Sequence, residues 1–427
     1  MRSISRAGRE SGALGMTMLN GRKQFLIWIP AVLIVVALMV AVFIQVRGLT
    51  AVRRAPYIIG EPEEGAALFF GDKQCGICHS INGFGGRVAP DLSGKRPGTP
   101  AMGWISAVLW NHGPGMWRQI RQKNDPYPQL NSQEMADIFS FLYQASGIDL
   151  AGDPGAGQRV FNEKGCVRCH SVGGGGGQTA PDLSKIAAGS DSNAWTLAML
   201  NHAGSMIAPI TSTLGQWPQF TGNEMNDLIA YVRLRAPQPA TNAREIPGNA
   251  TWGWGVFQRR CMQCHSVRGL GGSLGPELGP ERDLPLTTGQ FASVLWNHAP
   301  AMLRRAHENG IPPPVLEGNE MADLRTFLAS LRYFEPTGSP LVGERVFSER
   351  GCAACHGHMA EGTQIGPSLR SGTEAFTTIS FTVALWRHGP RMMDRAQELG
   401  IPWPTLKATD LGDLVSFLNA PAHARSN

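Results

Sequence analysis

Eight cysteines stand in four pairs, and each pair is followed directly by a histidine in the pattern Cys-x-x-Cys-His. Two thiols three residues apart on a helical turn can form thioether bonds to the two vinyl groups of one haem. The histidine that follows can then reach the iron as its proximal ligand. The four motifs contain Cys75, Cys78 and His79; Cys166, Cys169 and His170; Cys261, Cys264 and His265; and Cys352, Cys355 and His356.

Zinc sites and thioredoxin-like redox pairs also use two cysteines at this spacing. Four copies that all carry the attached histidine favour covalent haem over both alternatives. Structural disulfides are excluded because the motifs use every cysteine of the chain. The sequence therefore predicts four covalently bound haem c groups. Because haem is attached in this way outside the cytoplasm, the motifs also predict an exported protein.

The motifs belong to a larger repeat. Their first cysteines are 91, 95 and 91 residues apart, which indicates tandem domains rather than a solenoid. Each copy has a proline eleven residues after its motif histidine, and a methionine four residues after an Asn-His or Arg-His step. The prolines are Pro90, Pro181, Pro276 and Pro367. The methionines are Met116, Met206, Met302 and Met392, and the histidines before them are His112, His202, His298 and His388.

The elements that position these residues are expected to be helices. Each repeat should contain a short helix ending near its motif, a long Gly/Pro loop, a middle helix such as 102–111, and a terminal helix. Gly113-Pro114 is predicted to end the middle helix of the first repeat, which would place Met116 on a loop. No alternating run indicates a strand. The predicted fold class is therefore all-α.

Each repeat resembles a small class I cytochrome c domain. The resemblance is carried by the motif with its preceding glycine and aromatic residues, the loop proline, the methionine, and a terminal helix with an aromatic residue. It covers about residues 60–420, four times over. It implies that the first and last helices cross, and that the proline carbonyl accepts a hydrogen bond from the ligating imidazole. It also implies a loop methionine as the sixth iron ligand.

The methionine series lies 36 or 37 residues after the proximal histidine, a spacing that is short for this family. The series of histidines four residues earlier therefore stays open as the alternative sixth ligand. Trp110, Trp296 and Trp386 precede these histidines and are expected to line the haem pocket or the core.

A transmembrane signal anchor is predicted at residues 25–46, FLIWIPAVLIVVALMVAVFIQV, a run of 22 residues without a charge. The apolar region of a cleaved signal peptide is shorter, about 7–15 residues. Basic residues before the run place the N-terminus in the cytoplasm by the positive-inside rule. The expected location is the bacterial inner membrane, with the haem domains in the periplasm.

The composition gives a net charge of +5 from 38 basic and 33 acidic residues, with no basic block, so nucleic-acid binding is not indicated. The 52 glycines and 30 prolines favour small domains with long irregular loops. The predicted organisation is a cytoplasmic tail (1–24), the anchor (25–46), a linker (47–60), and four cytochrome c domains at 61–149, 150–240, 241–335 and 336–427.

If both axial positions are filled at every site, no iron is open to a substrate. We therefore expect a non-enzymatic carrier of single electrons between a membrane quinol-oxidising complex or dehydrogenase and a periplasmic or terminal acceptor. The alternatives are an integral electron-transfer subunit of a larger respiratory complex, or a haem enzyme or sensor with one open iron. The expected partners are the membrane and redox proteins, with no small-molecule substrate and no nucleic acid.

Overall fold

The computed structural model describes residues 57–93, 102–146, 151–186, 191–236, 248–278, 287–331, 338–370 and 375–421. The chain divides into two units, Met1–Arg54 and Ala55–Asn427, and every described residue belongs to the second unit. The predicted anchor at 25–46 lies outside the described residues. Within these residues, no helix has both the length and the apolar character that crossing a membrane requires.

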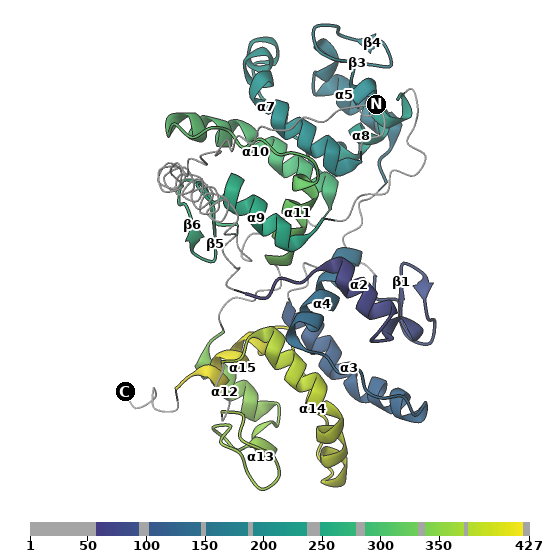
Figure 1. Ribbon diagram of the computed structural model, residues 1–427, viewed down its shortest axis with the longest axis vertical. Coiled ribbons are helices and arrows are strands. Elements are labelled where there is room, and N and C mark those ends of the chain that lie inside the picture. The colour runs from purple at the N-terminus through teal and green to yellow at the C-terminus, as the bar shows by residue number, and fades with distance from the viewer. Residues whose placement is uncertain are drawn as a thin grey trace, which may run out of the picture. The chain divides into compact units, whose positions relative to one another are not determined.

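The described chain contains four segments with a common order of elements, called repeats 1 to 4 below (Figure 1). Repeat 1 contains α2 (Pro62–Phe70), η1 (Cys75–Ile77), β1 (Ser80–Ile81), β2 (Phe84–Gly85), α3 (Met102–Gln122) and α4 (Ser132–Ser146). Repeat 2 contains α5 (Pro154–Glu163), η2 (Cys166–Arg168), β3 (Ser171–Val172), β4 (Gly175–Gly176), α6 (Leu183–Ile186), α7 (Ser192–Leu214) and α8 (Glu224–Leu234). Repeat 3 contains α9 (Ala250–Arg260), β5 (Ser266–Val267), β6 (Leu270–Gly271), α10 (Thr288–Glu308) and α11 (Glu320–Ser330). Repeat 4 contains α12 (Pro340–Glu349), α13 (Ala353–His356), α14 (Thr378–Glu398) and α15 (Asp410–Asn419).

The first and last helices of each repeat cross at a glycine. A Cβ atom on Gly65 of α2 would lie 1.9 Å from the backbone oxygen of Asp137 in α4, so only a hydrogen atom fits at this position. The carboxylate of Asp137 also accepts a hydrogen bond from the backbone N–H of Glu61 at the start of α2, over 2.8 Å. The corresponding glycine and aspartate pairs are Gly157 with Asp227, Gly253 with Asp323, and Gly343 with Asp413.

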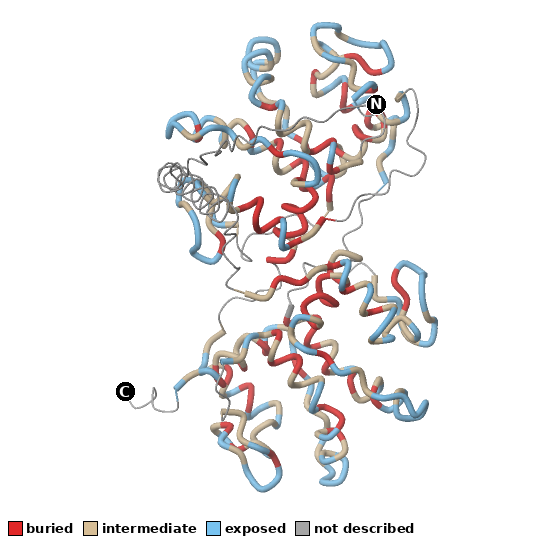
Figure 2. Tube along the Cα trace, in the orientation of Figure 1, coloured by how far each residue is buried: buried red, intermediate tan, exposed pale blue. Residues whose placement is uncertain are grey.

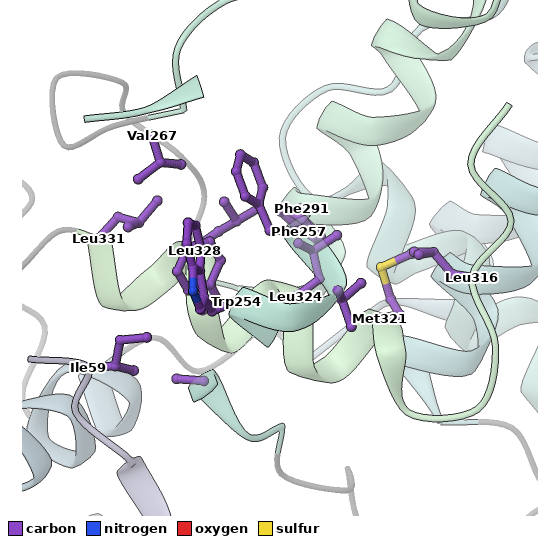
Figure 3. Close-up of a cluster of buried hydrophobic side chains, with 13 residues drawn as sticks. Ile59, Trp254, Phe257, Val267, Phe291, Leu316, Met321, Leu324, Leu328 and Leu331 are labelled. Carbon is purple, nitrogen blue, oxygen red and sulfur yellow. The ribbon is translucent and has the colours of Figure 1, made fainter. Parts of the chain in front are cut away.

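Each repeat has a hydrophobic core between these crossing helices (Figure 2). In repeat 3, Trp254 and Phe257 of α9 pack with Leu324 and Leu328 of α11 (Figure 3). Ile59, which precedes α2 of repeat 1, lies in this same cluster. The core of repeat 3 is therefore completed by a residue from repeat 1.

The fold is mainly helical, but the prediction that it contains no strands is wrong. Two-residue strands pair antiparallel directly after the motif in repeats 1 to 3. In repeat 1 the pairing joins Ser80 to Gly85 and Ile81 to Phe84. Gly83 between the strands has a φ of 78°, which allows the tight reversal. Strands this short cannot show the alternation of side chains from which strands are predicted.

The prediction that Gly113-Pro114 ends the middle helix is also wrong, because α3 continues to Gln122 with Pro114 inside it. Proline removes the hydrogen bond to the carbonyl four residues earlier, here that of Trp110. The indole N–H of Trp403 in repeat 4 donates to this carbonyl instead, over 3.4 Å. A side chain from another repeat thus satisfies the group that the proline leaves free. The other middle helices also contain prolines: Pro209 in α7, Pro300 in α10 and Pro390 in α14.

Candidate haem-attachment sites

Each Cys-x-x-Cys-His motif folds into one tight turn. In repeats 1 and 2 the turn is a short 3-10 helix, and in repeat 4 it is a single α-helical turn. The backbone N–H of each motif histidine donates to the carbonyl of the first cysteine, over 2.9–3.0 Å. All eight cysteines are half-buried free thiols. Each turn therefore brings two thiols and one imidazole to the same place.

A proline carbonyl orients each of these imidazoles. In repeat 1, Nδ1 of His79 lies 2.9 Å from the carbonyl oxygen of Pro90. Because a carbonyl oxygen can only accept, Nδ1 donates the hydrogen and Nε2 keeps its lone pair for a metal. The equivalent contacts are His170 to Pro181 (2.9 Å), His265 to Pro276 (2.8 Å) and His356 to Pro367 (2.9 Å).

Burial keeps the first thiol of each motif uncharged. It raises the pKa of Cys75, Cys166 and Cys352 to about 11 and that of Cys261 to about 12. Among the described residues, no group of three or more His, Cys, Asp and Glu side chains could hold a metal ion. Each motif turn supplies the groups that a covalently attached haem requires, namely two thiols and an imidazole whose Nε2 is free to bind iron.

An aspartate clamps the hairpin that follows the first motif. The hydroxyl of Ser93, the backbone N–H groups of Gly83 and Ser93, and the hydroxyl of Ser80 all donate to Asp91. These hydrogen bonds, that of the Ser93 hydroxyl foremost, hold the pKa of Asp91 well below its usual range. Asp91 follows Pro90 directly, so the clamp fixes the loop that carries the imidazole-binding carbonyl.

A salt bridge that sequence reasoning missed joins each motif to the terminal helix. Lys73, two residues before Cys75, lies 2.8 Å from Glu134 of α4, and it also donates to the carbonyl of Gln129. The equivalent pairs are Lys164 with Glu224 (2.9 Å), Arg259 with Glu320 (3.0 Å) and Arg350 with Asp410 (2.9 Å). The sequence feature that could have indicated these salt bridges is a basic residue two positions before the first cysteine of every motif.

The middle helix carries both candidate series for the sixth iron ligand. Met116 and His112 are four residues apart in α3, so they lie on one face, and the methionine is on a helix rather than on the expected loop. In all four repeats the methionine is half-buried and the histidine is exposed. Nδ1 of three of these histidines lies within hydrogen-bond distance of the carbonyl four residues earlier: His112 to Val108, His202 to Ala198, and His298 to Val294.

The far end of the middle helix reaches the motif. Lys123, the first residue after α3, places Nζ 4.0 Å from Sγ of Cys78. In repeat 2 the guanidinium of Arg168, inside the motif, donates to the carbonyl of Thr213, which is seven residues after Met206. Residues seven apart on a helix share a face. In repeats 1 and 2 the methionine thus lies one turn closer than the histidine to the end of the helix that approaches the motif.

The three tryptophans lie in or against the hydrophobic core, which is one of the two places expected for them. Trp110 and Trp296 are buried, but each belongs to the core of another repeat, namely repeat 4 and repeat 2 respectively. Their indole N–H groups donate to loop carbonyls of those repeats, as does that of Trp386, which donates to Pro128 in repeat 1. The tryptophans therefore join repeats to one another.

A sequence model of cytochrome c matches residues 62–146, 155–235 and 251–332, which together make up more than half of the chain. The chain belongs to the cytochrome c family. Covalently bound haem c and a haem-based role in electron transfer follow from this membership. No curated protein and no solved structure gives a significant match.

The matched segments correspond to repeats 1 to 3. Repeat 4 lies outside them, yet it has the same motif turn, the same contact between His356 and Pro367, and the same helix crossing at Gly343.

Proposed function

We propose that this protein is a membrane-anchored tetrahaem c-type cytochrome. It would carry single electrons between a membrane quinol-oxidising complex or dehydrogenase and a periplasmic or terminal acceptor. The observation that carries the proposal is the contact between the motif imidazole and the loop proline, which occurs four times, including once in repeat 4. Four equivalent sites in one chain suit a relay better than a reaction at a single site.

The chain supplies the same holding groups at every site. The two motif cysteines would attach the haem, the motif histidine would bind the iron through Nε2, and the methionine of the middle helix would fill the sixth position. Haem c with both axial positions filled supplies reversible one-electron chemistry and leaves no position for a substrate. This arrangement supports an electron-transfer protein without a catalytic site of its own.

The proposed location is the bacterial inner membrane, with residues 25–46 as the anchor and the repeats in the periplasm. Ile59 of the predicted linker 47–60 packs into the core of repeat 3, so residues 47–56 are the part that could act as a spacer, of at most about 36 Å when extended. The proposed partners are redox proteins, and we propose neither a nucleic acid nor a small-molecule substrate as a partner.

The experiment is to quantify haem in the purified chain and to record the far-red absorption and low-temperature EPR of its oxidised form. We expect four haems per chain and a methionine-to-iron charge-transfer band whose intensity matches all four. Met302→Ala should remove the part of the band intensity that belongs to one haem, and the matched variant His298→Ala should retain the full intensity. Low-spin signals of the His/His type would move the ligands to the histidine series, and fewer than four haems would refute the tetrahaem proposal.

Two further measurements address the alternatives. Carbon monoxide binding by the reduced protein at one haem per chain would identify an open iron and hence an enzyme or sensor. A stable complex that persists after extraction in mild detergent would identify a subunit of a larger oxidoreductase. The carrier proposal expects no carbon monoxide binding and a protein that purifies alone.

A further inference from the structure

The central part of each middle helix contacts a loop of another repeat. The helix contributes the two residues before its histidine, and the loop is the proline-containing segment ahead of the terminal helix, called the docking loop below. The docking loops are residues 127–130, 217–220, 313–316 and 403–406. Repeat 1 docks with repeat 4, and repeat 2 docks with repeat 3, in both directions within each pair.

An asparagine forms two hydrogen bonds with one backbone position of the docking loop. Nδ2 of Asn111 donates to the carbonyl of Leu406 (2.9 Å), and the N–H of Leu406 donates to Oδ1 of Asn111 (2.8 Å). Arg387 of repeat 4 replaces the asparagine and donates to the carbonyl of Leu130. The same double contact joins Asn297 to Phe220 and Asn201 to Leu316. The asparagine or arginine before each histidine therefore forms hydrogen bonds with backbone groups in the docking loop of the partner repeat.

Two of the tryptophan contacts use carbonyls that the prolines inside the helices leave free. Pro300 leaves the carbonyl of Trp296 without its helical donor, and Trp217 of repeat 2 donates to that carbonyl over 3.0 Å. Trp296 in turn donates to the carbonyl of Pro218, and the two indole rings stack at 4.3 Å between centroids. Trp403 and Trp110 have the same relationship in the other pair, with centroids 4.2 Å apart. A proline within the helix thus creates a docking point for the partner.

The cores are continuous across each pair. Ile379 and Val383 of α14 lie in the core of repeat 1, and Trp110 and Trp117 of α3 lie in the core of repeat 4. In Figure 1, α3 and α14 run side by side, as do α7 and α10. Buried apolar surface is the main source of stable association. The pairs are therefore packed modules rather than beads joined by a linker.

The docking contacts lead to the attachment motifs. Trp386 of repeat 4 donates to the carbonyl of Pro128, and the next residue, Gln129, accepts a hydrogen bond from Lys73, which stands two residues before Cys75. Repeat 3 reaches repeat 2 by the same steps, through Trp296, Pro218, Gln219 and Lys164. Each pair therefore has a path of two hydrogen bonds, joined by backbone bonds, from the middle helix of one repeat to the motif of its partner.

The two pairs also touch, between repeats 1 and 3. The carboxylate of Glu61 accepts hydrogen bonds from the backbone N–H groups of Ala250 (2.9 Å) and Thr251 (2.8 Å) at the start of α9. Ile59 enters the core of repeat 3, as described above. These contacts place repeat 1 next to repeat 3.

We propose that electrons are exchanged in the order 4–1–3–2, through the docked pairs and the contact between repeats 1 and 3, and not in the order of the chain. This inference rests on the proposed electron-transfer function. In each exchange one repeat is oxidised by one electron and its neighbour is reduced by the same electron, and no bond or proton changes place. Electron tunnelling weakens steeply with distance through protein, so packed neighbours exchange faster than repeats that are only consecutive.

The test compares two full-length haem-loaded variants that each retain two attachment sites. The first carries Cys→Ala changes at Cys166, Cys169, Cys261 and Cys264, which leaves repeats 1 and 4; the second carries them at Cys261, Cys264, Cys352 and Cys355, which leaves repeats 1 and 2. Pulsed EPR of the oxidised proteins measures the dipolar coupling between the two remaining ferric ions. We expect stronger coupling in the first variant. Stronger coupling in the second would overturn the proposed order.

Asn111→Ala probes the docking itself, with Asn201→Ala in the other pair as the matched control. Both variants keep all four attachment motifs and are compared with the wild type by amide hydrogen exchange. Asn111→Ala should speed exchange of the backbone amides in the docking loop 403–406 about tenfold, and should leave those of 313–316 unchanged. Asn201→Ala should do the reverse, and equal effects of both variants on both loops would contradict separate pairs.

Absence of haem from the wild-type protein would refute the proposed function, whereas four haems with coupling in chain order would refute only the pairing.

Discussion

Trp386 donates its indole N–H to the backbone carbonyl of Pro128, 258 residues earlier in the chain, over 2.8 Å. Trp110 makes the reciprocal contact with Pro404, over 2.7 Å. The two repeats at the ends of the described chain are therefore each other's packing partners. Substitutions at this interface should therefore affect the stability of both repeats, because each contributes residues to the core of the other.

Asn111→Ala should destabilise the protein although it removes no apolar surface. The change deletes both hydrogen bonds to Leu406 and leaves the backbone groups of that residue without partners. We expect a loss of about 2 kcal/mol in the free energy of unfolding, measured by urea titration with circular dichroism. Arg118→Ala, an exposed position on the same helix, is the control and should change little. Equal effects of both variants would show that the double contact does not stabilise the pair.

Gly65→Ala should disrupt repeat 1. The added Cβ would lie 1.9 Å from the backbone oxygen of Asp137, and a backbone atom cannot move aside as a side chain can. We expect a loss of about 3 kcal/mol or more, seen as a lower thermal midpoint. Gly115→Ala is the matched change on α3, where a Cβ meets nothing within 4 Å, and it should stabilise by up to about 1 kcal/mol. A neutral Gly65→Ala would contradict the close helix crossing.

Asp91 should make stability depend on acidity. In the folded state the pKa of Asp91 is held well below its usual range. The pKa of an aspartate in the unfolded chain is about 3.9. The carboxylate therefore stabilises the fold fully at a pH above this value, and its contribution is lost as the pH falls below it. Asp91→Asn should lower the thermal midpoint at pH 7 and flatten its decline on acidification. Midpoints recorded from pH 7 to pH 3 check this, with exposed Asp125→Asn as the control. Parallel curves for wild type and Asp91→Asn would contradict the clamp.

His265→Ala should remove the low-spin signal of the third haem. The imidazole is the group that Pro276 orients in repeat 3, and each of the other repeats has its own imidazole and proline. The other three signals should therefore remain, as measured by haem quantification and EPR. His307→Ala, an exposed position on α10, serves as the control. Loss of all four signals would show that the sites are not independent in assembly.

The features that could be predicted from the sequence are those formed by residues close together in the chain. The motif occupies five consecutive residues, and Pro90 follows His79 by eleven, so one turn and one loop bring them together. Helices were predictable because their apolar period is local. The salt bridge between Lys73 and Glu134 was visible only as a repeated basic position, because its partner lies in a distant helix.

The content of each repeat is thus encoded locally in the chain: the attachment motif, the oriented imidazole and the helices that carry them. Tertiary structure alone decided that α3 passes through Pro114, because the rule that proline ends a helix assumes a lost hydrogen bond, and Trp403 of another repeat satisfies the free carbonyl of Trp110. It also decided which repeats are neighbours. Asn111 and Leu406 are 295 residues apart, and no local spacing records such a contact.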